Sequence, residues 1–388
     1  MKITALNVPT KRLPGLDLLR AIAILWVLLF HGMTEGLGAP LPALGKLGWM
    51  GVDLFFVLSG YLIGSQLLKA YASGQTPNIG SFYLRRAFRI LPTYWVIVTL
   101  YSVFPILRES SGMQPTWQFL TFTENFLIDY KHNRTFSHAW SLCVEEHFYL
   151  IFPLLVWLLM RKPSWKSTVA TGLFIMGGGM LLRAYIWCNY VNVPHPQGMP
   201  YVEMIYYPTH ARLDGLLAGV MLVSIQWFRP RLWRWTMDNS YLVLGAGVVS
   251  IAVAICVARA RTDFNASVFG FPLLSLSLAL VAAGCISTKS IFGKFSIPGA
   301  KAIATITFSL YLSHKMTWHA VRTFWPESVA KGGTQALLIY AGSAFLVGAL
   351  LYFTVERTFL LLRKSIFPEE QRQPLGTAIV NRSPELAN

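Results

Sequence analysis

The sequence predicts an all-α, polytopic integral membrane protein that crosses the bilayer about ten times. Of its 388 residues, 54% are apolar and only 13% are charged, whereas soluble domains carry roughly 25% charged residues. Apolar stretches long enough to cross about 30 Å of hydrocarbon recur along the chain, separated by short basic or Pro/Gly-containing segments. The expected spans are 15–33, 49–69, 86–106, 140–160, 167–188, 206–227, 240–258, 266–286, 302–321 and 335–356.

The net charge of +16 is distributed by loop rather than over one surface. Of the 33 Lys and Arg residues, 21 fall in alternate connections, on the side of the N-terminus. Because cytoplasmic loops carry an excess of Lys and Arg, this bias predicts cytoplasmic N- and C-termini and an even number of spans. The cations flank helix ends and form no stripe interleaved with aromatic residues, which argues against a nucleic-acid partner.

The first span, GLDLLRAIAILWVLLFHG, contains an arginine and a histidine, Arg20 and His31. Ionisable side chains inside a span are costly and usually functional. An offset of 11 residues, at about 100° per residue, places the two on one face of a helix, about 16 Å apart along its axis. A simpler interpretation is that Arg20 extends to the cytoplasmic interface while His31 meets water at the other end.

The second and third spans add further polar candidates. In the second, GWMGVDLFFVLSGYLIGSQLL, these are Asp53 and Ser59, and the GYLIG segment favours close contact with another helix. The third opens with FYLRRAFRILPTYW, where Arg86 and Arg89 share one face at a helix start. These two arginines have two interpretations: an ordinary basic cluster at a cytoplasmic helix end, or a clamp for phosphate oxygens, which guanidinium groups fit in a fork geometry.

Two adjacent carboxylates, Glu145 and Glu146, lie near the start of the fourth span, SHAWSLCVEEHFYLIFPL, just after Trp140. A carboxylate there can stabilise the helix dipole, so capping is one interpretation of at least one of them. Further on, YYPTHARLDGLLAGV brings Arg212 to a helix start, and ITFSLYLSHKM places His314 inside the ninth span. Polar residues spread over so many spans favour one shared central cavity over isolated interface anchors.

The cysteines and the C-terminal tail complete the prediction. Residues 1–360 are expected to form one transmembrane domain, and residues 361–388 a short, polar, disordered cytoplasmic tail. The cysteines lie in or at the ends of apolar spans without a CxxC pair or a metal-ligand spacing, so we expect free, buried thiols and no metal site. They are Cys143, Cys188, Cys256 and Cys285.

Several short fragments, taken together in order, resemble the acyltransferase-3 family, the membrane O-acyltransferases that modify bacterial cell-envelope and exported glycans. Each fragment alone is weak, but their joint order over most of the chain is specific. Departures are small: Tyr61 and Thr358 stand where Phe and Pro are usual. The fragments are the Arg-x10-His pair of the first span, GVDLFFVLSG (51–60), RRAFRILP (85–92), WSLCVEEHFYL (140–150), RLDGLLAG (212–219), SLYLSH (309–314) and ERT (356–358).

The resemblance implies an enzyme of the inner (cytoplasmic) cell membrane that takes an acyl group from cytoplasmic acyl-CoA, usually acetyl-CoA. The acyl group would pass to a hydroxyl of a cell-envelope glycan or a lipid-linked saccharide. Acetyl-CoA would be a substrate, and no tightly bound cofactor is expected. Arg86 and Arg89 would bind this donor, and Arg20 would be a further contact to its phosphates or thioester.

The resemblance also assigns the chemistry to His31, with Arg20 and Glu145 completing the catalytic set. An imidazole with a pKa of about 6.5 suits a base that removes the hydroxyl proton. His31 could instead carry the acyl group as a nucleophile, and the sequence does not separate these roles. Glu145 is expected to orient an imidazole or to bind the acceptor. The expected substrate-binding residues are Asp53, Ser59, Trp140, Arg212 and His314.

Two alternatives stay open at this stage. A transporter or flippase of a lipid-linked glycan would show half-helices broken at corresponding positions in two halves, and the sequence shows no such pattern. Within the enzyme class, succinyl or another short acyl group could replace acetyl.

Overall fold

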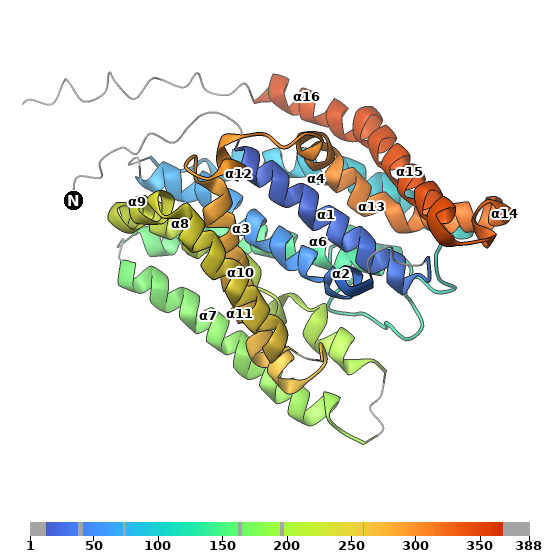
Figure 1. Cartoon of the computed structure of the whole chain (residues 1–388), viewed down its shortest axis with the longest axis horizontal. Coiled ribbons are helices and arrows are strands. Elements are labelled where there is room, and N and C mark those ends of the chain that lie inside the picture. The colour runs from blue at the N-terminus through green and yellow to red at the C-terminus, as the bar shows by residue number, and fades with distance from the viewer. Residues whose placement is uncertain are drawn as a thin grey trace, which may run out of the picture.

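The computed structural model describes residues 13–37, 42–72, 75–161, 165–194, 198–258 and 260–367, and these ranges fold almost wholly into helices (Figure 1). No strand forms in them beyond one isolated bridge between Met113 and Thr135. The long helices are α1 (Pro14–Thr34), α3 (Met50–Ala72), α4 (Ile79–Val103), α6 (Trp140–Met160), α7 (Trp165–Ile186), α8 (Asp214–Phe228), α10 (Ser240–Val257), α11 (Phe271–Ile286), α13 (Ala300–Phe324) and α15 (Gly333–Leu351).

Shorter elements connect the long helices at both ends of the bundle, with α9 at one end and α14 near the other (Figure 1). The short α-helices are α2 (Pro42–Leu47), α5 (Thr116–Leu120), α9 (Pro230–Asp238), α12 (Ile291–Lys294), α14 (Pro326–Ala330) and α16 (Arg357–Ile366). Three short 3-10 helices are η1 (Pro105–Leu107), η2 (Ser137–Ala139) and η5 (Thr209–Ala211). Four π-helical segments are η3 (Trp187–Val191), η4 (Tyr201–Tyr206), η6 (Ala266–Gly270) and η7 (Tyr352–Glu356).

Seven of the described helices are long and apolar enough to cross a bilayer: α1, α3, α6, α7, α10, α11 and α15. The helices α4 and α13 have 25 residues each, about 37 Å of helix, but their composition is more polar. The helix α8 has only 15 residues, about 22 Å, which is short of the hydrocarbon thickness. Each of the ten expected spans thus overlaps a helix, and seven of these helices meet the length and apolarity needed for a crossing.

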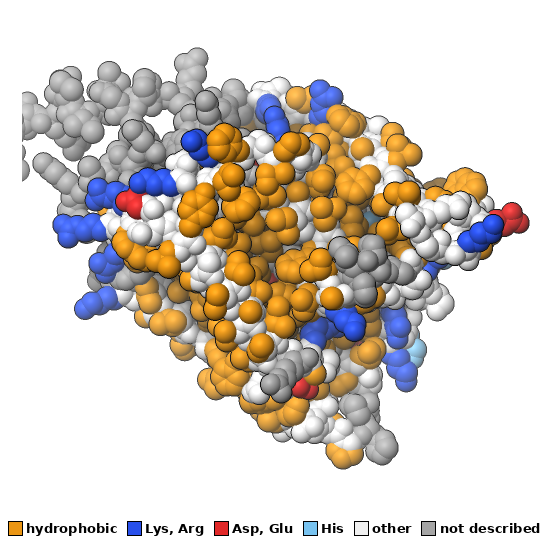
Figure 2. Space-filling view, viewed as in Figure 1, with side chains coloured by type: hydrophobic (Ala, Val, Ile, Leu, Met, Phe, Trp, Pro, Cys, Tyr) orange, Lys and Arg blue, Asp and Glu red, His pale blue; other side chains and the backbone are white. Residues whose placement is uncertain are grey.

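The bundle has a central and a peripheral set of helices. The spanning windows of α3 and α11 are 72% buried, whereas those of α7 and α10 are 22% buried. The peripheral helices turn large apolar side chains outward, among them Phe174, Leu181, Leu242 and Val249. Figure 2 shows the resulting broad apolar surface, with Lys and Arg side chains gathered at the edge near α9. Such a surface is typical of lipid contact.

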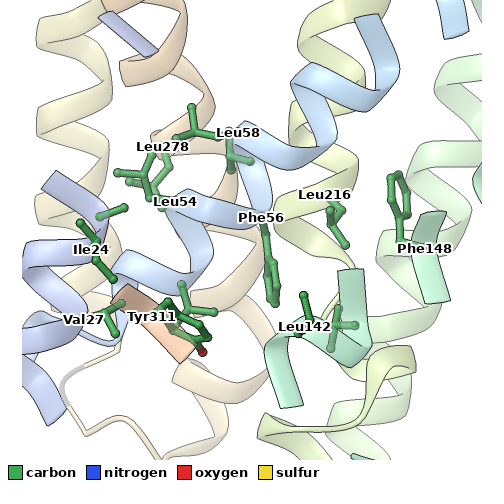
Figure 3. Packing of buried hydrophobic residues seen from close by; sticks show 14 of the residues in the cluster. Ile24, Val27, Leu54, Phe56, Leu58, Leu142, Phe148, Leu216, Leu278 and Tyr311 are labelled. Carbon is green, nitrogen blue, oxygen red and sulfur yellow. The ribbon is translucent and has the colours of Figure 1, made fainter. Parts of the chain in front are cut away.

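The core is built mainly by α1, α3, α8, α11 and α13. Side chains of α1, α3 and α11 pack together in it, including Ile24, Leu54 and Leu278 (Figure 3). The helices α3 and α8 approach each other closely: a Cβ on Gly60 would lie 2.1 Å from the carbonyl oxygen of Leu216. Only glycine fits there. The close contact expected of the GYLIG segment is therefore confirmed at Gly60, whereas Gly64 makes only ordinary contacts.

The sixth expected span, 206–227, is wrong as a continuous helix. The π-helical turn η4 ends at Tyr206, the backbone leaves the regular helix over 207–213, and α8 begins only at Asp214. Non-helical backbone at membrane depth needs protein partners. Asn125 donates to the carbonyl oxygen of Tyr207 at 3.2 Å, and Arg183 donates to that of Ala211 at 2.6 Å. Two buried ion pairs flank this segment: Arg212 to Asp53 at 2.7 Å and Arg183 to Asp214 at 2.8 Å.

Three further expectations need correction or limits. The helix α4 begins at Ile79, seven residues before the expected third span, because Asn78 caps it by accepting from the Ser81 amide. The helix α16 continues past residue 360 to Ile366, and residues 368–388 of the expected tail lie outside the described residues. All four thiols are free, but only Cys143 and Cys285 are buried; Cys188 and Cys256 are exposed.

Candidate functional site

Two cavities lie inside the bundle, and the side chains of Val52 and Tyr311 line both of them. One, of about 140 Å³, is lined by three arginines and is called the arginine cavity here. The other, of about 320 Å³, is lined by His31 and His138 and is called the histidine cavity. Because Val52 and Tyr311 belong to both walls, the two cavities are neighbours with a thin partition between them.

The arginine cavity collects its cations from two helices. Arg20 comes from α1, and Arg86 and Arg89 come from successive turns of α4, on one face as their spacing predicts. The guanidinium of Arg86 lies 3.8 Å from the ring centre of Tyr149. Arg89 lies 3.5 Å from the carboxylate of Glu356. Three cations in one small cavity form a strong site for an anion.

Two carboxylates balance part of this charge. Glu145 lines the arginine cavity and accepts hydrogen bonds from Ser59, at 3.0 Å, and from Tyr149. Glu356, at the end of the π-helical turn η7, is almost fully buried and accepts from Ser309 at 2.7 Å. The structure therefore places Glu145 among the arginines. The expectation that it orients an imidazole does not fit its contacts, which are to hydroxyl groups.

The histidine cavity brings together His31 of α1 and His314 of α13. Nδ1 of His31 lies 2.7 Å from Nε2 of His314, and Nδ1 of His314 lies 2.7 Å from the carbonyl oxygen of Tyr311. A carbonyl oxygen only accepts, so Nδ1 of His314 carries a proton and donates it. For neutral rings, Nε2 of His314 then accepts from Nδ1–H of His31. This chain leaves the lone pair on Nε2 of His31 available as a base or a nucleophile.

A third histidine, His138, completes the group. Its ring centre lies 4.9 Å from that of His314 and 5.9 Å from that of His31. Neither of its ring nitrogens has a hydrogen-bond partner among the described residues, although the side chain is buried. The sequence did not single out His138 because it lies in the turn η2, ahead of the expected span. Its signal was the SHAW segment that leads into α6.

The hydroxyl group of Tyr311, in the partition between the cavities, makes two hydrogen bonds. The Tyr311 hydroxyl donates to the carbonyl oxygen of His138 at 2.7 Å, and the Ser141 hydroxyl lies 2.7 Å from the same Tyr311 oxygen, to which it donates. The backbone that carries His138 is thereby tied to α13, which carries His314. The same residue that separates the cavities also fixes two of the three imidazoles.

An ion network not expected from the sequence lies beside the histidines. Lys315 pairs with Glu35 at 2.9 Å and with Glu109 at 3.6 Å, and Arg322 contacts Glu35 at 3.4 Å. Glu109 also accepts from the Phe136 amide. The network joins the end of α1, the loop after α4 and α13. It therefore fixes the outer part of the histidine cavity.

The remaining expected substrate-binding residues divide into two groups. Ser59 lines the arginine cavity, Trp140 lines the histidine cavity, and His314 contacts His31. Asp53 and Arg212 line neither cavity and bind each other. The guanidinium of Arg212 also lies 5.3 Å from the Trp140 ring centre, so the pair supports a wall of the histidine cavity.

Comparisons with known proteins identify relatives over most of the chain. A family model described as an acyltransferase domain (acyltransferase-3) matches residues 13–353. The peptidoglycan O-acetyltransferase OatA of Listeria monocytogenes is 30% identical over 78% of this chain and 49% of its own length. The O-acetyltransferase OatA of Staphylococcus aureus (strain NCTC 8325 / PS 47) is 27% identical over 78% of this chain and 50% of its own. A protein of S. aureus strain COL with a provisional O-acetyltransferase name is 29% identical over the same shares.

The chain thus spans about half the length of the curated relatives it matches. No solved structure shows a significant match.

Proposed function

Since this chain belongs to the acyltransferase-3 family of O-acyltransferases, we propose that it moves an acetyl group from acetyl-CoA in the arginine cavity to a glycan hydroxyl in the histidine cavity. The observation that carries the proposal is the shared wall. An anion-binding cavity and a cavity with an available imidazole nitrogen adjoin at Val52 and Tyr311. Donor and acceptor can then meet within one protein while approaching from opposite ends of α1.

The donor assignment rests on charge. Acetyl-CoA carries several phosphate groups, and Arg20, Arg86 and Arg89 offer guanidinium groups around one cavity. The Lys and Arg bias along the chain predicts that the end with Arg86 and Arg89 faces the cytoplasm, where acyl-CoA is made. We extend the proposal accordingly to ten crossings, cytoplasmic termini and the inner (cytoplasmic) membrane.

The chemistry follows from the tautomer of His31. Nε2 of His31 removes the proton of the acceptor hydroxyl, and that oxygen attacks the thioester carbonyl. A C–O bond forms, the C–S bond breaks, and the thiolate of CoA receives the proton from His31. As the ring becomes charged, Nδ1–H still donates to His314. A covalent acetyl-His31 would use the same lone pair, and intact-protein mass spectrometry after mixing with acetyl-CoA alone separates the two routes.

A glycan acceptor suits the other walls of the histidine cavity. The rings of Trp140 and Tyr207 stack with centres 5.0 Å apart and planes at 8°, and both rings line the cavity. Flat aromatic faces with polar edges are suited to binding sugar rings. The Listeria relative bears the name of a peptidoglycan O-acetyltransferase, which favours a cell-envelope glycan as the acceptor here.

The test compares two histidines in a host that lacks the gene. We expect His31→Ala to abolish acetylation of cell-envelope and secreted glycans, measured by mass spectrometry at equal protein level. His319→Ala is the matched control, because His319 lies on α13 and lines neither cavity. Normal acetylation in the His31→Ala strain would contradict the proposal.

A further inference from the structure

A third hollow, which we call the lateral groove, lies at the side of the bundle next to the histidine cavity. It has a volume of about 650 Å³ and lies between α2, the start of α3, the end of α10 and the start of α11. Trp49 and Arg261 line both the groove and the histidine cavity. The two spaces are therefore neighbours.

Small and aliphatic residues form most of the groove wall. Alanine and glycine at four wall positions leave the space open, and aliphatic side chains make it apolar. Among the described residues, the charged side chains that line it are Lys46 and Arg261, both cations. In Figure 2, Lys and Arg side chains interrupt the apolar surface between α2 and the nearby ends of α10 and α11. The small residues are Ala43, Ala254, Ala258 and Gly270.

Arg261 is held at the junction. Its guanidinium lies 5.4 Å from the ring centre of Phe30, the neighbour of His31, and 5.1 Å from that of Tyr206. Trp187 anchors the adjacent backbone by donating to the carbonyl oxygen of Thr262 at 2.9 Å. Among the described residues no carboxylate lies within ion-pair distance of Arg261. Stacking on aromatic rings leaves the edge of a guanidinium for an anion such as phosphate.

We propose that the lateral groove admits an acceptor saccharide carried on a polyprenyl phosphate or diphosphate, a deepening that rests on the proposed function. The isoprenoid chain lies along the apolar wall formed by α10 and α11. The phosphate lies at Arg261 and Lys46, near the end of α10 where the chain leaves the membrane. The saccharide then enters the histidine cavity beside His31. The two cations of the groove and its shared wall with the histidine cavity favour this occupant over a neutral lipid.

The test measures binding directly and does not require the native sugar. The purified full chain is placed in phosphatidylcholine nanodiscs with a photoreactive polyprenyl diphosphate, and labelled peptides are mapped by mass spectrometry. We expect labelling of α2, the end of α10 and the start of α11. Arg261→Gln should reduce it about tenfold, the usual effect of losing one hydrogen bond to a charged group. Lys331→Gln, a cation on the turn between α14 and α15, should leave it unchanged.

Filling the groove provides a second variant. Ala258→Trp places a large ring at a partly exposed wall position and should abolish labelling of the groove peptides. Ala252→Trp is the matched control, because Ala252 lies exposed on α10, the helix that ends just before Ala258, but does not line the groove. Labelling spread over the whole apolar surface, or unchanged in Ala258→Trp, would overturn the inference. Equal competition by phosphatidylglycerol would show occupancy by bulk anionic lipid only and would overturn it as well.

The His31→Ala variant separates this inference from the proposed function. It should label normally while transferring no acetyl group. Normal labelling together with His31-independent acetylation would refute the proposed function and leave the lipid site standing. If the groove peptides of the wild type are not labelled but acetylation still depends on His31, only the lipid site is refuted.

Discussion

The arginine cavity and the histidine cavity differ in how the chain assembles them. The arginine cavity takes two of its three cations, Arg86 and Arg89, from successive turns of α4, and the third, Arg20, from α1. The histidine cavity joins His31 to His314, 283 positions away, and adds His138 from a turn. The spacing of residues along one helix therefore predicts that Arg86 and Arg89 lie together, but it does not predict the contact between His31 and His314. The difference also suggests a division of labour, in which one cavity binds by charge and the other acts through a hydrogen-bonded relay.

A large loss of activity is expected when His314 is replaced. His314→Phe keeps a ring in the core but removes the acceptor for Nδ1–H of His31, so the imidazole loses its fixed tautomer. We expect kcat to fall about 100-fold, within the range for general-base catalysis, with KM for acetyl-CoA unchanged. Steady-state kinetics in nanodiscs measures both. His314→Gln, whose amide oxygen accepts, should recover part of kcat. Equal losses in the two variants would show that His314 only fills space.

A smaller effect, on the KM for acetyl-CoA, is expected in the arginine cavity. Arg86→Gln should raise KM for acetyl-CoA about tenfold, because a phosphate loses a charge-assisted hydrogen bond. KM for the acceptor should not change. The control is Arg85→Gln, since Arg85 is exposed at the same helix start and does not line the cavity. Equal increases in this KM in both variants would show that Arg86 acts only as one of several surface cations.

The smallest expected effect concerns stability at the outer loops. Glu124 is fully buried in the segment between α5 and η2, and neither carboxylate oxygen has a hydrogen-bond partner among the described residues. Burial raises the pKa of Glu124 well above its usual range. Glutamate in the unfolded chain titrates at about 4.3. Between the two pKa values the folded protein keeps a proton that the unfolded chain has lost, so stability falls as pH rises.

Glu124→Gln is neutral at every pH and escapes this loss. The variant should therefore melt at a higher temperature than the wild type, by a margin that grows between about pH 5 and about pH 8. Thermal unfolding in detergent, followed by tryptophan fluorescence, measures the margin. A constant margin over this range would show that Glu124 is already ionised in the folded protein.

The first helix shows which features of the site could be predicted from the sequence. Helix geometry placed Arg20 and His31 on one face about 16 Å apart, and the structure gives each a different cavity along the same helix. The ionisable character of His314 inside a span marked it as a candidate as well. The sequence could not show that His314 contacts His31, because this contact depends on the packing of α1 against α13.

Other features depend on long-range packing in the same way. The break before α8 follows from the partners of Arg183 and Arg212, which lie on other elements. Glu145 was expected to orient an imidazole or to bind the acceptor, and its hydrogen-bond partners are Ser59 of α3 and Tyr149 one turn later. The pattern along one helix placed Arg86 and Arg89 on one face, whereas contacts between helices could not be predicted from it.

Donor and acceptor are proposed to reach the two cavities from opposite sides of the membrane, and membrane vesicles of known orientation test this proposal. Inside-out vesicles from cells that express the protein are given acetyl-CoA with a radiolabelled acetyl group on the outside. We predict that label appears in glycans on the luminal side. Right-side-out vesicles should label only when acetyl-CoA is loaded within, and His31→Ala vesicles should not label in either case. Labelling of right-side-out vesicles by external acetyl-CoA would contradict the account.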